Sequence, residues 1–402
     1  MKKKIVLIII LTLAFAGVFV CFKCYAEQKP WNVHVTVRHG NVRVQYDLNE
    51  NVTAGVDGAQ QGCYLSAKGK LQMFMQLQEM QFPDEICGDY VLPGFKSICE
   101  SFNHVNAPKV DSSVDFGKEG FKYTKGQDGV AIDVSELFRR MIFANCGDEI
   151  MLPIVVDRAV TVESLVKDTS VKGKFSTSFS LENANRAFNV RKAADAIDGI
   201  TIAAEQKFSF NDVVGERSAE RGYKNAKVIV QGQYVDGIGG GVCQVSTTLY
   251  NALLLSDVIP VAHAHSLVPS YVAAGFDATV SYGNLDLSFT NETGSSLYVS
   301  AKVKGNSLTV TVYGVPNRYK IVRHSTEERI PFSVVEIFDP VSYPEVVYDD
   351  TFVVKRNGSD GVESKSYLVY YDGDQEVARK LIRTDCYKKV DKVVVRGKYP
   401  RN

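Results

Sequence analysis

Residues 239–250 read GGGVCQVSTTLY, a run of three glycines that leads into a helical pattern. Consecutive glycines can adopt backbone conformations that other residues rarely adopt, and they allow a ligand to approach closely. After them, one stripe at helical spacing is apolar and consists of Val242, Val245, Leu249, Ala252 and Leu253. The opposite stripe is polar and consists of Cys243, Ser246, Thr247 and Tyr250. The stretch therefore predicts a glycine turn and then a helix that carries Cys243 in its first turn, away from the apolar side.

The first turn of a helix is a favourable place for an anion, and Cys243 occupies it in this prediction. Unpaired N–H groups and the helix dipole stabilise a thiolate there, so the pKa of such a cysteine falls below its free value of about 8.5. The thiolate is the form of cysteine that attacks a carbonyl carbon. Cys243 is therefore the candidate nucleophile, and its backbone N–H, aided by Gln244, is the candidate donor to an oxyanion.

Candidates for a general base and for its partner follow Cys243 in the chain. Residues 261–267 read VAHAHSL, and on a strand His263 and His265 would share one face. Both histidines are candidates for the base, because strand alternation does not choose between them. Asp277 lies near the start of a predicted strand, residues 276–280, and is the candidate that orients the imidazole. Cysteine, histidine and aspartate in this order are typical of transglutaminase-like and papain-like enzymes, which is an analogy of fold only.

Two other interpretations of these residues stay open. In the first, the chain is a non-catalytic binding protein in which Cys243 packs as a small apolar side chain and the histidines bond neighbouring backbone. In the second, His263 and His265 bind zinc together with Asp277 or Cys243. The main expectation is a site that holds no cofactor and no metal.

Several further residues are candidate contacts to a ligand. They are Arg186, Asn211, Arg217, Gly240, Gly241, Gln244 and Ser246. An arginine in such a site can clamp the carboxylate of a peptide through paired hydrogen bonds. Arg186, Asn211 and Arg217 can equally cap or bridge elements of the fold, so both roles stay open for them.

Residues from about 174 to 316 resemble the core of the VanW family, first noticed in vancomycin-resistance gene clusters. The matching pieces are Arg186, Asn189, residues 208–211, Gly215, Arg217, residues 222–223, residues 239–250, His263, His265, Tyr271, Gly275, residues 277–280 and Asp286. One departure is Ala-Glu-Gln at residues 204–206, where the family usually has Pro-Gly-Glu. The resemblance implies a cell-envelope protein that binds peptidoglycan. With the Cys243 pattern, it suggests a cysteine-dependent hydrolase or transferase acting on wall peptides; the alternative is a non-catalytic wall-binding protein.

The flanking segments suggest two further modules. Sequence patterns predict a β-hairpin over residues 31–48, helices at Leu71–Met80, Phe95–Phe102 and after Val134, and one strand from Ile150 to Val156. The region that follows the hairpin, residues 61–173, resembles an α+β module thought to bind peptidoglycan, with a structural spacer as the alternative. The C-terminal part is rich in strands and resembles the five-glycine β-module of wall proteins, considered to contact amino-sugar polymers.

The expected fold class is therefore α+β and multidomain. The predicted divisions are an export segment at 1–26, a hairpin lead-in at 27–60, an α+β wall-binding module at 61–173, a VanW-like α+β core at 174–316 and an all-β module at 317–402. The order of residues in the core suggests a papain-like or transglutaminase-like arrangement.

The N-terminus predicts export. Three lysines, Lys2 to Lys4, precede an apolar stretch from Ile5 to Phe22, and such lysines stay on the cytosolic side while the rest crosses. Cleavage after Ala26 would release the protein. Retention, favoured because Cys24 and Tyr25 make an indifferent cleavage site, would anchor it in the membrane. Lysine plus arginine equal aspartate plus glutamate at 46 each, so no net charge draws the chain to nucleic acid.

Overall fold

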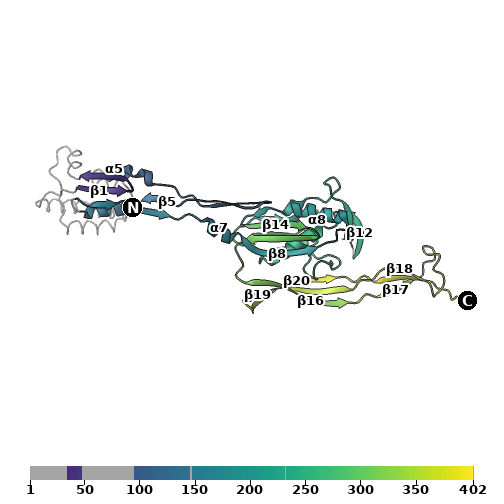
Figure 1. Ribbon diagram of the computed structural model, residues 1–402. Coiled ribbons are helices and arrows are strands. Elements are labelled where there is room, and N and C mark those ends of the chain that lie inside the picture. The colour runs from purple at the N-terminus through teal and green to yellow at the C-terminus, as the bar shows by residue number, and fades with distance from the viewer. Residues whose placement is uncertain (1–33, 48–94, 145–146, 231, 402) are drawn as a thin grey trace, which may run out of the picture. The chain divides into compact units, whose positions relative to one another are not determined.

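The computed structural model describes residues 34–47, 95–144, 147–230 and 232–401 (Figure 1). These residues form a mixed α and β protein built mostly from sheets, with few helices. The chain divides into two compact units, residues 1–112 with 125–161 and residues 113–124 with 162–402. The predicted export segment and the predicted helix Leu71–Met80 lie outside the described residues. Within the described ranges, no helix is long and apolar enough to cross a membrane.

The first unit contains two small sheets and two α-helices among its described residues. Its elements are β1 (His34–His39), β2 (Val42–Asp47), α5 (Phe95–Ser101), the 3-10 helix η1 (Asn103–Val105), β5 (Gly129–Ile132), α6 (Val134–Phe143), β6 (Glu149–Met151) and β7 (Ile154–Asp157). The strands pair in the orders β2-β1-β6 and β5-β7. The rings of Phe95 and Phe138 meet edge to face with centroids 5.4 Å apart, so α5 and α6 share one core.

Most of the elements predicted here are confirmed. The hairpin forms as β1 and β2, and helices begin at Phe95 and Val134. Helix α6 begins where the Asp133 side chain accepts a hydrogen bond from the Glu136 N–H at 2.9 Å, which caps the helix. The single strand predicted from Ile150 to Val156 is wrong. The stretch is divided at Pro153 into β6, which pairs with β1, and β7, which pairs with β5. Proline interrupts a strand because it has no N–H to donate to the hydrogen-bond ladder.

The second unit contains a four-stranded antiparallel sheet with the strand order β8-β15-β14-β9. These strands are β8 (Ser170–Ser178), β9 (Ile200–Ile202), β14 (Leu297–Lys304) and β15 (Ser307–Gly314). Helix α8 (Ala184–Ile197) packs against β14, and helix α10 (Val242–Leu254) packs against β8 and β15 (Figure 1). Buried apolar side chains, among them Val190, Leu249 and Val310, fill the space between sheet and helices. Strands β14 and β15 form a hairpin around residues 305–306.

Smaller elements surround this sheet. They are β3 (Ser113–Gly117), β4 (Gly120–Thr124), α7 (Val162–Asp168), β10 (Lys207–Ser209), α9 (Phe210–Val214), β11 (Asn225–Val230), β12 (Gln233–Ile238) and β13 (Ser288–Thr290). Strands β11 and β12 form a hairpin that leads directly into the glycine turn before α10. The hairpin thus fixes where that helix begins.

Helix α10 is buried on both of its predicted stripes. The apolar stripe lies in the core as predicted, but the polar stripe is also covered, and Ser246 and Thr247 are 0% exposed. Their hydroxyls are satisfied by the segment that follows Gly275. The Ser246 Oγ donates to the Ala278 carbonyl at 2.6 Å, and the Thr247 Oγ1 accepts from the Ala278 N–H at 3.0 Å. Polar residues on this helix therefore hold a neighbouring segment in place, and only Cys243 stays half-buried.

Gly173 on β8 lies against the C-terminal end of α10, where a side chain has no room. A Cβ there would lie 2.3 Å from the Ser256 Oγ and 2.4 Å from the Ala252 carbonyl oxygen. We expect Gly173→Ala to lower the free energy of unfolding by about 1–3 kcal/mol through overpacking, measured by denaturant titration. The control is Gly117→Ala, because a Cβ at Gly117 meets nothing within 4 Å. Equal losses in the two variants would contradict this packing argument.

The C-terminal part of the second unit contains only strands among its described residues, which confirms the prediction of an all-β module. The strands are β16 (Lys320–Ile330), β17 (Val334–Ile337), β18 (Phe352–Arg356), β19 (Gly361–Asp372), β20 (Gln375–Tyr387) and β21 (Lys392–Arg396). They form two three-stranded sheets with the orders β16-β19-β20 and β17-β21-β18.

Candidate active site

The glycine turn places Cys243 at the open end of α10. Gly241 is the N-cap residue with φ +109°, a conformation that favours glycine. The N–H groups of Val242 and Gln244 donate to the carbonyl oxygens of Gly239 at 3.1 Å and Gly241 at 3.0 Å. For the N–H of Cys243 itself, the described residues provide no acceptor. A free N–H and the positive end of the helix dipole therefore lie beside the thiol.

The sulfur of Cys243 contacts the segment that contains Asp277. Its Sγ lies 3.5 Å from the carbonyl oxygen of Val280 and 3.7 Å from the Oγ1 of Thr279. Contrary to the prediction, neither residues 261–267 nor 276–280 form a regular strand. An isolated bridge between His263 and Thr279 joins the two segments and sets their register.

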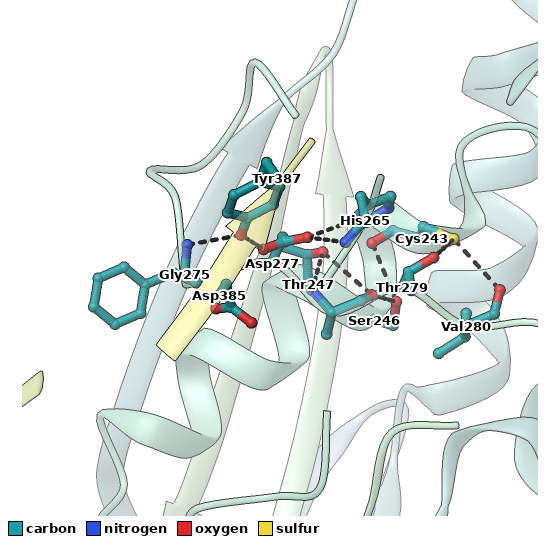
Figure 2. A network of polar contacts seen from close by, with 12 residues as sticks. Cys243, Ser246, Thr247, His265, Gly275, Asp277, Thr279, Val280, Asp385 and Tyr387 are labelled. Atoms are coloured by element: carbon teal, nitrogen blue, oxygen red, sulfur yellow. Dashed lines mark hydrogen bonds and ion pairs between the residues drawn. The ribbon is translucent and has the colours of Figure 1, made fainter. Parts of the chain in front are cut away.

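His265 lies between Asp277 and Cys243, as Figure 2 shows. The Nδ1 of His265 is 2.6 Å from the Oδ2 of Asp277, and the same oxygen accepts the His265 backbone N–H at 2.6 Å. Because Nδ1 is committed to the carboxylate, Nε2 is the ring nitrogen left to interact with the Cys243 thiol. Both His265 and Asp277 are buried, at 7% and 0% exposure. This is the arrangement of a nucleophile, a base and an orienting acid.

The electrostatics of the three groups favour an ion pair. Burial raises the pKa of Cys243, but the hydrogen bond and charge of His265 outweigh it and lower the pKa to about 7. Burial lowers the pKa of His265, but hydrogen bonds to Asp277 and Cys243 outweigh it and raise the pKa to about 9. Between these values, thiolate and imidazolium coexist, which is the reactive state of a cysteine paired with histidine.

Two residues that the sequence did not suggest bind the second oxygen of Asp277. The Oη of Tyr387 and the Nη2 of Arg383 both donate to Oδ1, the latter at 3.1 Å. Burial raises the pKa of Asp277, but its hydrogen bonds with His265 and Tyr387 outweigh that and hold the pKa below its usual value. No short-range signal connects these residues, because 106 and 110 positions separate Arg383 and Tyr387 from Asp277.

The other candidate base, His263, lies outside this network. It is exposed, and its carbonyl oxygen accepts the Thr279 N–H at 2.8 Å. The described contacts therefore assign His263 a backbone role in joining residues 261–267 to residues 276–280.

Several candidate ligand contacts are occupied by the fold. The Gln244 Nε2 donates to the Thr177 Oγ1 at 3.0 Å and to the Ser178 carbonyl at 2.9 Å, and the residue is 1% exposed. Ser246 is used by Ala278, as described above. Gly240 is buried, and a Cβ on it would lie 2.6 Å from the carbonyl oxygen of Lys227. These contacts stabilise the turn and the helix that present Cys243.

Two arginines flank the glycine turn. A Cβ on Gly239 would lie 2.8 Å from the Cβ of Arg217, and one on Gly241 would lie 3.1 Å from the Cγ of Arg186. Arg186 donates to the Gln244 Oε1 at 2.8 Å. Arg217 donates from Nη1 to the Asn211 Oδ1 at 2.6 Å, while its buried Nη2 has no partner among the described residues.

Asn211 is a structural link in this arrangement. Its Oδ1 accepts from Arg217, and its Nδ2 donates to the Leu285 carbonyl at 2.9 Å.

As for a metal, no cluster of three or more His, Cys, Asp or Glu side chains suited to hold an ion is found in the described ranges.

Comparisons with known proteins match two parts of the chain. Residues 185–313 match the family model described as VanW like protein, and residues 321–398 match the model described as G5 domain. The uncharacterized protein YoaR of Bacillus subtilis is 34% identical over 199 residues, which cover 49% of this chain and 60% of YoaR. The vancomycin B-type resistance protein VanW of Enterococcus faecalis is 29% identical over 115 residues, which cover 27% of this chain and 42% of VanW. The chain thus spans about half the length of the curated relatives it matches.

Two solved structures also match. HP0197-G5 covers 20% of this chain and 100% of its own, at 14% identity and a TM-score of 0.14. The IgA1 protease G5 domain covers 21% of this chain and 95% of its own, at 19% identity and a TM-score of 0.16. The family matches and the curated relatives together identify the two parts: the chain carries a VanW-like domain followed by a G5 domain, and YoaR and VanW are its homologues.

Proposed function

We propose that this chain is a cell-envelope enzyme that transfers or hydrolyses acyl groups of peptidoglycan peptides. Cys243 is the nucleophile, His265 the acid and base, and Asp277 the group that orients His265. The observation that carries the proposal is the hydrogen bond between the His265 Nδ1 and Asp277, together with the interaction of His265 with the Cys243 thiol at the N-terminal end of α10. A buried imidazole that is hydrogen-bonded to a carboxylate and interacts with a half-buried thiol is the arrangement that activates a cysteine.

The reaction follows from the positions of the three groups. The Cys243 thiolate attacks a carbonyl carbon, and the negative oxygen that results accepts the free Cys243 N–H. His265, as imidazolium, gives its proton to the leaving amine, and the C–N bond breaks to leave a thioester on Sγ. Water or a second amine then attacks the thioester. His265 takes the proton of the attacking group, the C–S bond breaks, and the thiolate is restored.

The proposed substrate class rests on two observations. A VanW-like domain and a G5 domain in one chain support a cell-wall substrate, and G5 domains are associated with binding wall polymers. Arg217 and Arg186 beside the turn before Cys243 support a substrate with a carboxylate, as wall peptides have. The unpartnered Nη2 of Arg217 is the donor available for it, since a buried N–H group without an acceptor is costly.

The pH dependence is the first test of this function. We expect kcat/KM for wall peptides to rise with pH through about 7, as Cys243 loses its proton. It is expected to fall again through about 9, as His265 loses the proton needed by the leaving amine. Initial rates on soluble wall fragments between pH 5 and 10 measure this profile. A rate that keeps rising beyond pH 9 would contradict the role of a protonated His265.

The alternative function is a non-catalytic wall-binding protein. The side chains of α10 that hold residues 276–280 favour it, because Ser246 and Thr247 act there as structural groups. In that case the wild type would bind wall polymers without changing their peptides, and Cys243→Ala would bind them equally well. Export through residues 1–26, by a cleaved signal or an anchor, belongs to both proposals.

A further inference from the structure

Strand β20 of the G5 domain reaches the candidate active site of the VanW-like domain. Both domains belong to the second compact unit. Arg383 and Tyr387 on β20 donate to the Oδ1 of Asp277, and Tyr387 is 1% exposed. Figure 2 shows the Tyr387 ring beside Asp277, on the side away from Cys243. The G5 domain, which the family models separate from the VanW-like domain, therefore supplies two hydrogen-bond donors to Asp277 of the VanW-like domain.

The two oxygens of Asp277 serve different domains. Oδ2 accepts the backbone N–H and lies 2.6 Å from the Nδ1 of His265, both in the VanW-like domain. Oδ1 accepts from Tyr387 and Arg383, both in the G5 domain. An ionised carboxylate has about four acceptor positions, so the four donors saturate it. Rotation of the carboxylate away from His265 would break the bonds to β20 as well.

The two G5 side chains are themselves held in place. The Tyr387 Oη accepts the Gly275 N–H at 2.8 Å, so the phenol proton is left for Asp277. The Nε of Arg383 donates to the Asp385 Oδ2 at 2.6 Å, and its guanidinium lies 5.5 Å from the centre of the Tyr250 ring on α10. Each contact fixes a donor that faces Asp277.

Strand β16 adds a second connection to the same place. Arg323 donates to the Asn251 Oδ1 on α10, and its guanidinium lies 4.8 Å from the centre of the Phe276 ring, next to Asp277. Asn251 in turn donates to the Phe276 carbonyl at 2.7 Å. The sheet β16-β19-β20 thus packs on the helix of the nucleophile and on the segment of the acid.

We propose that the G5 domain is part of the catalytic unit, with Arg383 and Tyr387 as positioning residues that hold the Asp277 carboxylate behind His265. This inference rests on the proposed function and adds to it. It assigns β20 a role in the chemistry of Cys243, in addition to any contact of the G5 domain with wall polymers.

The charges around the site predict how the loss of Arg383 acts. The thiolate, imidazolium and carboxylate together carry one negative charge, and Arg383 offsets it from the side of Asp277. The other charged or titratable groups that face the three are Arg186, Arg217 and Tyr271 near Cys243, and Tyr250 and Asp385 near Arg383. Without Arg383, the negative charge of Asp277 is no longer offset, and it favours a proton on Cys243, because a nearby negative charge raises the pKa of an acid.

The test is the pH profile of Cys243 alkylation by iodoacetamide in the full chain, followed by mass spectrometry of the Cys243 peptide. We expect Arg383→Met to move the midpoint upward by about 0.5–1 pH unit. Arg383→Lys keeps the positive charge, so its midpoint is expected to lie close to that of the wild type. Tyr387→Phe is expected to move it less, because only a hydrogen bond is lost. The matched control is Arg379→Met on the same strand, since Arg379 pairs with the exposed Glu376 and is expected to cause no shift.

A second measurement separates action through Asp277 from a general effect. In an Asp277→Asn background, Arg383→Met is expected to cause no further shift, because coupled residues are not additive. An Arg383→Met profile equal to that of the wild type, or a shift that persists with Asp277→Asn, would overturn the inference. Neither result touches the proposed function, which fails instead if the wild-type thiol titrates at the ordinary value of about 8.5.

Discussion

Replacing Cys243 by alanine is expected to abolish the action of the chain on wall peptides, with a loss of at least about 10³-fold in kcat/KM. The reason is that Sγ forms the thioester and that the Cys243 thiol is the nucleophile that interacts with His265 at the start of α10. Cys243→Ser is expected to be nearly as inactive, since a serine hydroxyl stays protonated where the thiol does not. Product analysis of soluble wall fragments by chromatography and mass spectrometry measures the loss.

The control for this variant is Cys386→Ala. Cys386 is an exposed cysteine on β20 and contributes no side chain to the network around Asp277. It is expected to keep full activity, and melting curves establish that both variants fold. Activity that survives in Cys243→Ala would move the nucleophile elsewhere and remove the proposed mechanism.

Replacing His265 by alanine is expected to raise the pKa of Cys243 from about 7 to above about 8.5. His265 is the group that lowers this pKa, and the burial that opposes it stays when the imidazole is removed. At pH 7 the thiolate fraction falls from about a half to a few per cent or less, so alkylation at pH 7 slows by about tenfold or more. The rate of Cys243 alkylation between pH 5 and 9 gives the result.

His263→Ala is the matched control, because the two histidines are separated by one residue and only His265 contacts Asp277. Its profile is expected to equal that of the wild type. If His263→Ala shifted the midpoint and His265→Ala did not, the assignment of the base would be wrong.

Local periodicity predicted the helices that matter for the site. The alternation of apolar and polar stripes after the glycine run placed a helix with Cys243 in its first turn, and α10 begins at Val242. Caps and glycine turns are short-range signals of this kind. The same reasoning failed for the polar stripe. Ser246 and Thr247 look like exposed residues in sequence, whereas their hydroxyls satisfy the backbone of Ala278 inside the protein.

Strand periodicity could not decide whether His263 or His265 is the base. His263 and His265 have the same parity, so a regular strand would turn both toward the same face. The segment is irregular instead, with one bridge at His263, and the backbone N–H of His265 bonds Asp277 directly. In such an irregular segment, individual polar contacts take the place of a strand ladder. The sequence therefore carries no regular alternation from which the buried histidine could be predicted.

The role of β20 could not be predicted from the sequence for a different reason. Tyr387 and Arg383 are separated from Asp277 by more than a hundred residues and follow a predicted domain boundary. A lone tyrosine and a lone arginine in a strand-rich module carry no pattern. Only the tertiary packing of the sheet β16-β19-β20 on α10 brings them to the carboxylate.

The most direct measurement of the central claim is the intact mass of the full chain after incubation with soluble wall peptides and a rapid acid quench. The predicted result is a covalent adduct with the mass of an acyl peptide, located on Cys243 by fragmentation, cleaved by hydroxylamine and absent from Cys243→Ala. Wall peptides whose products change while no thioester forms on Cys243, or whose products are the same with the wild type and with Cys243→Ala, would contradict it.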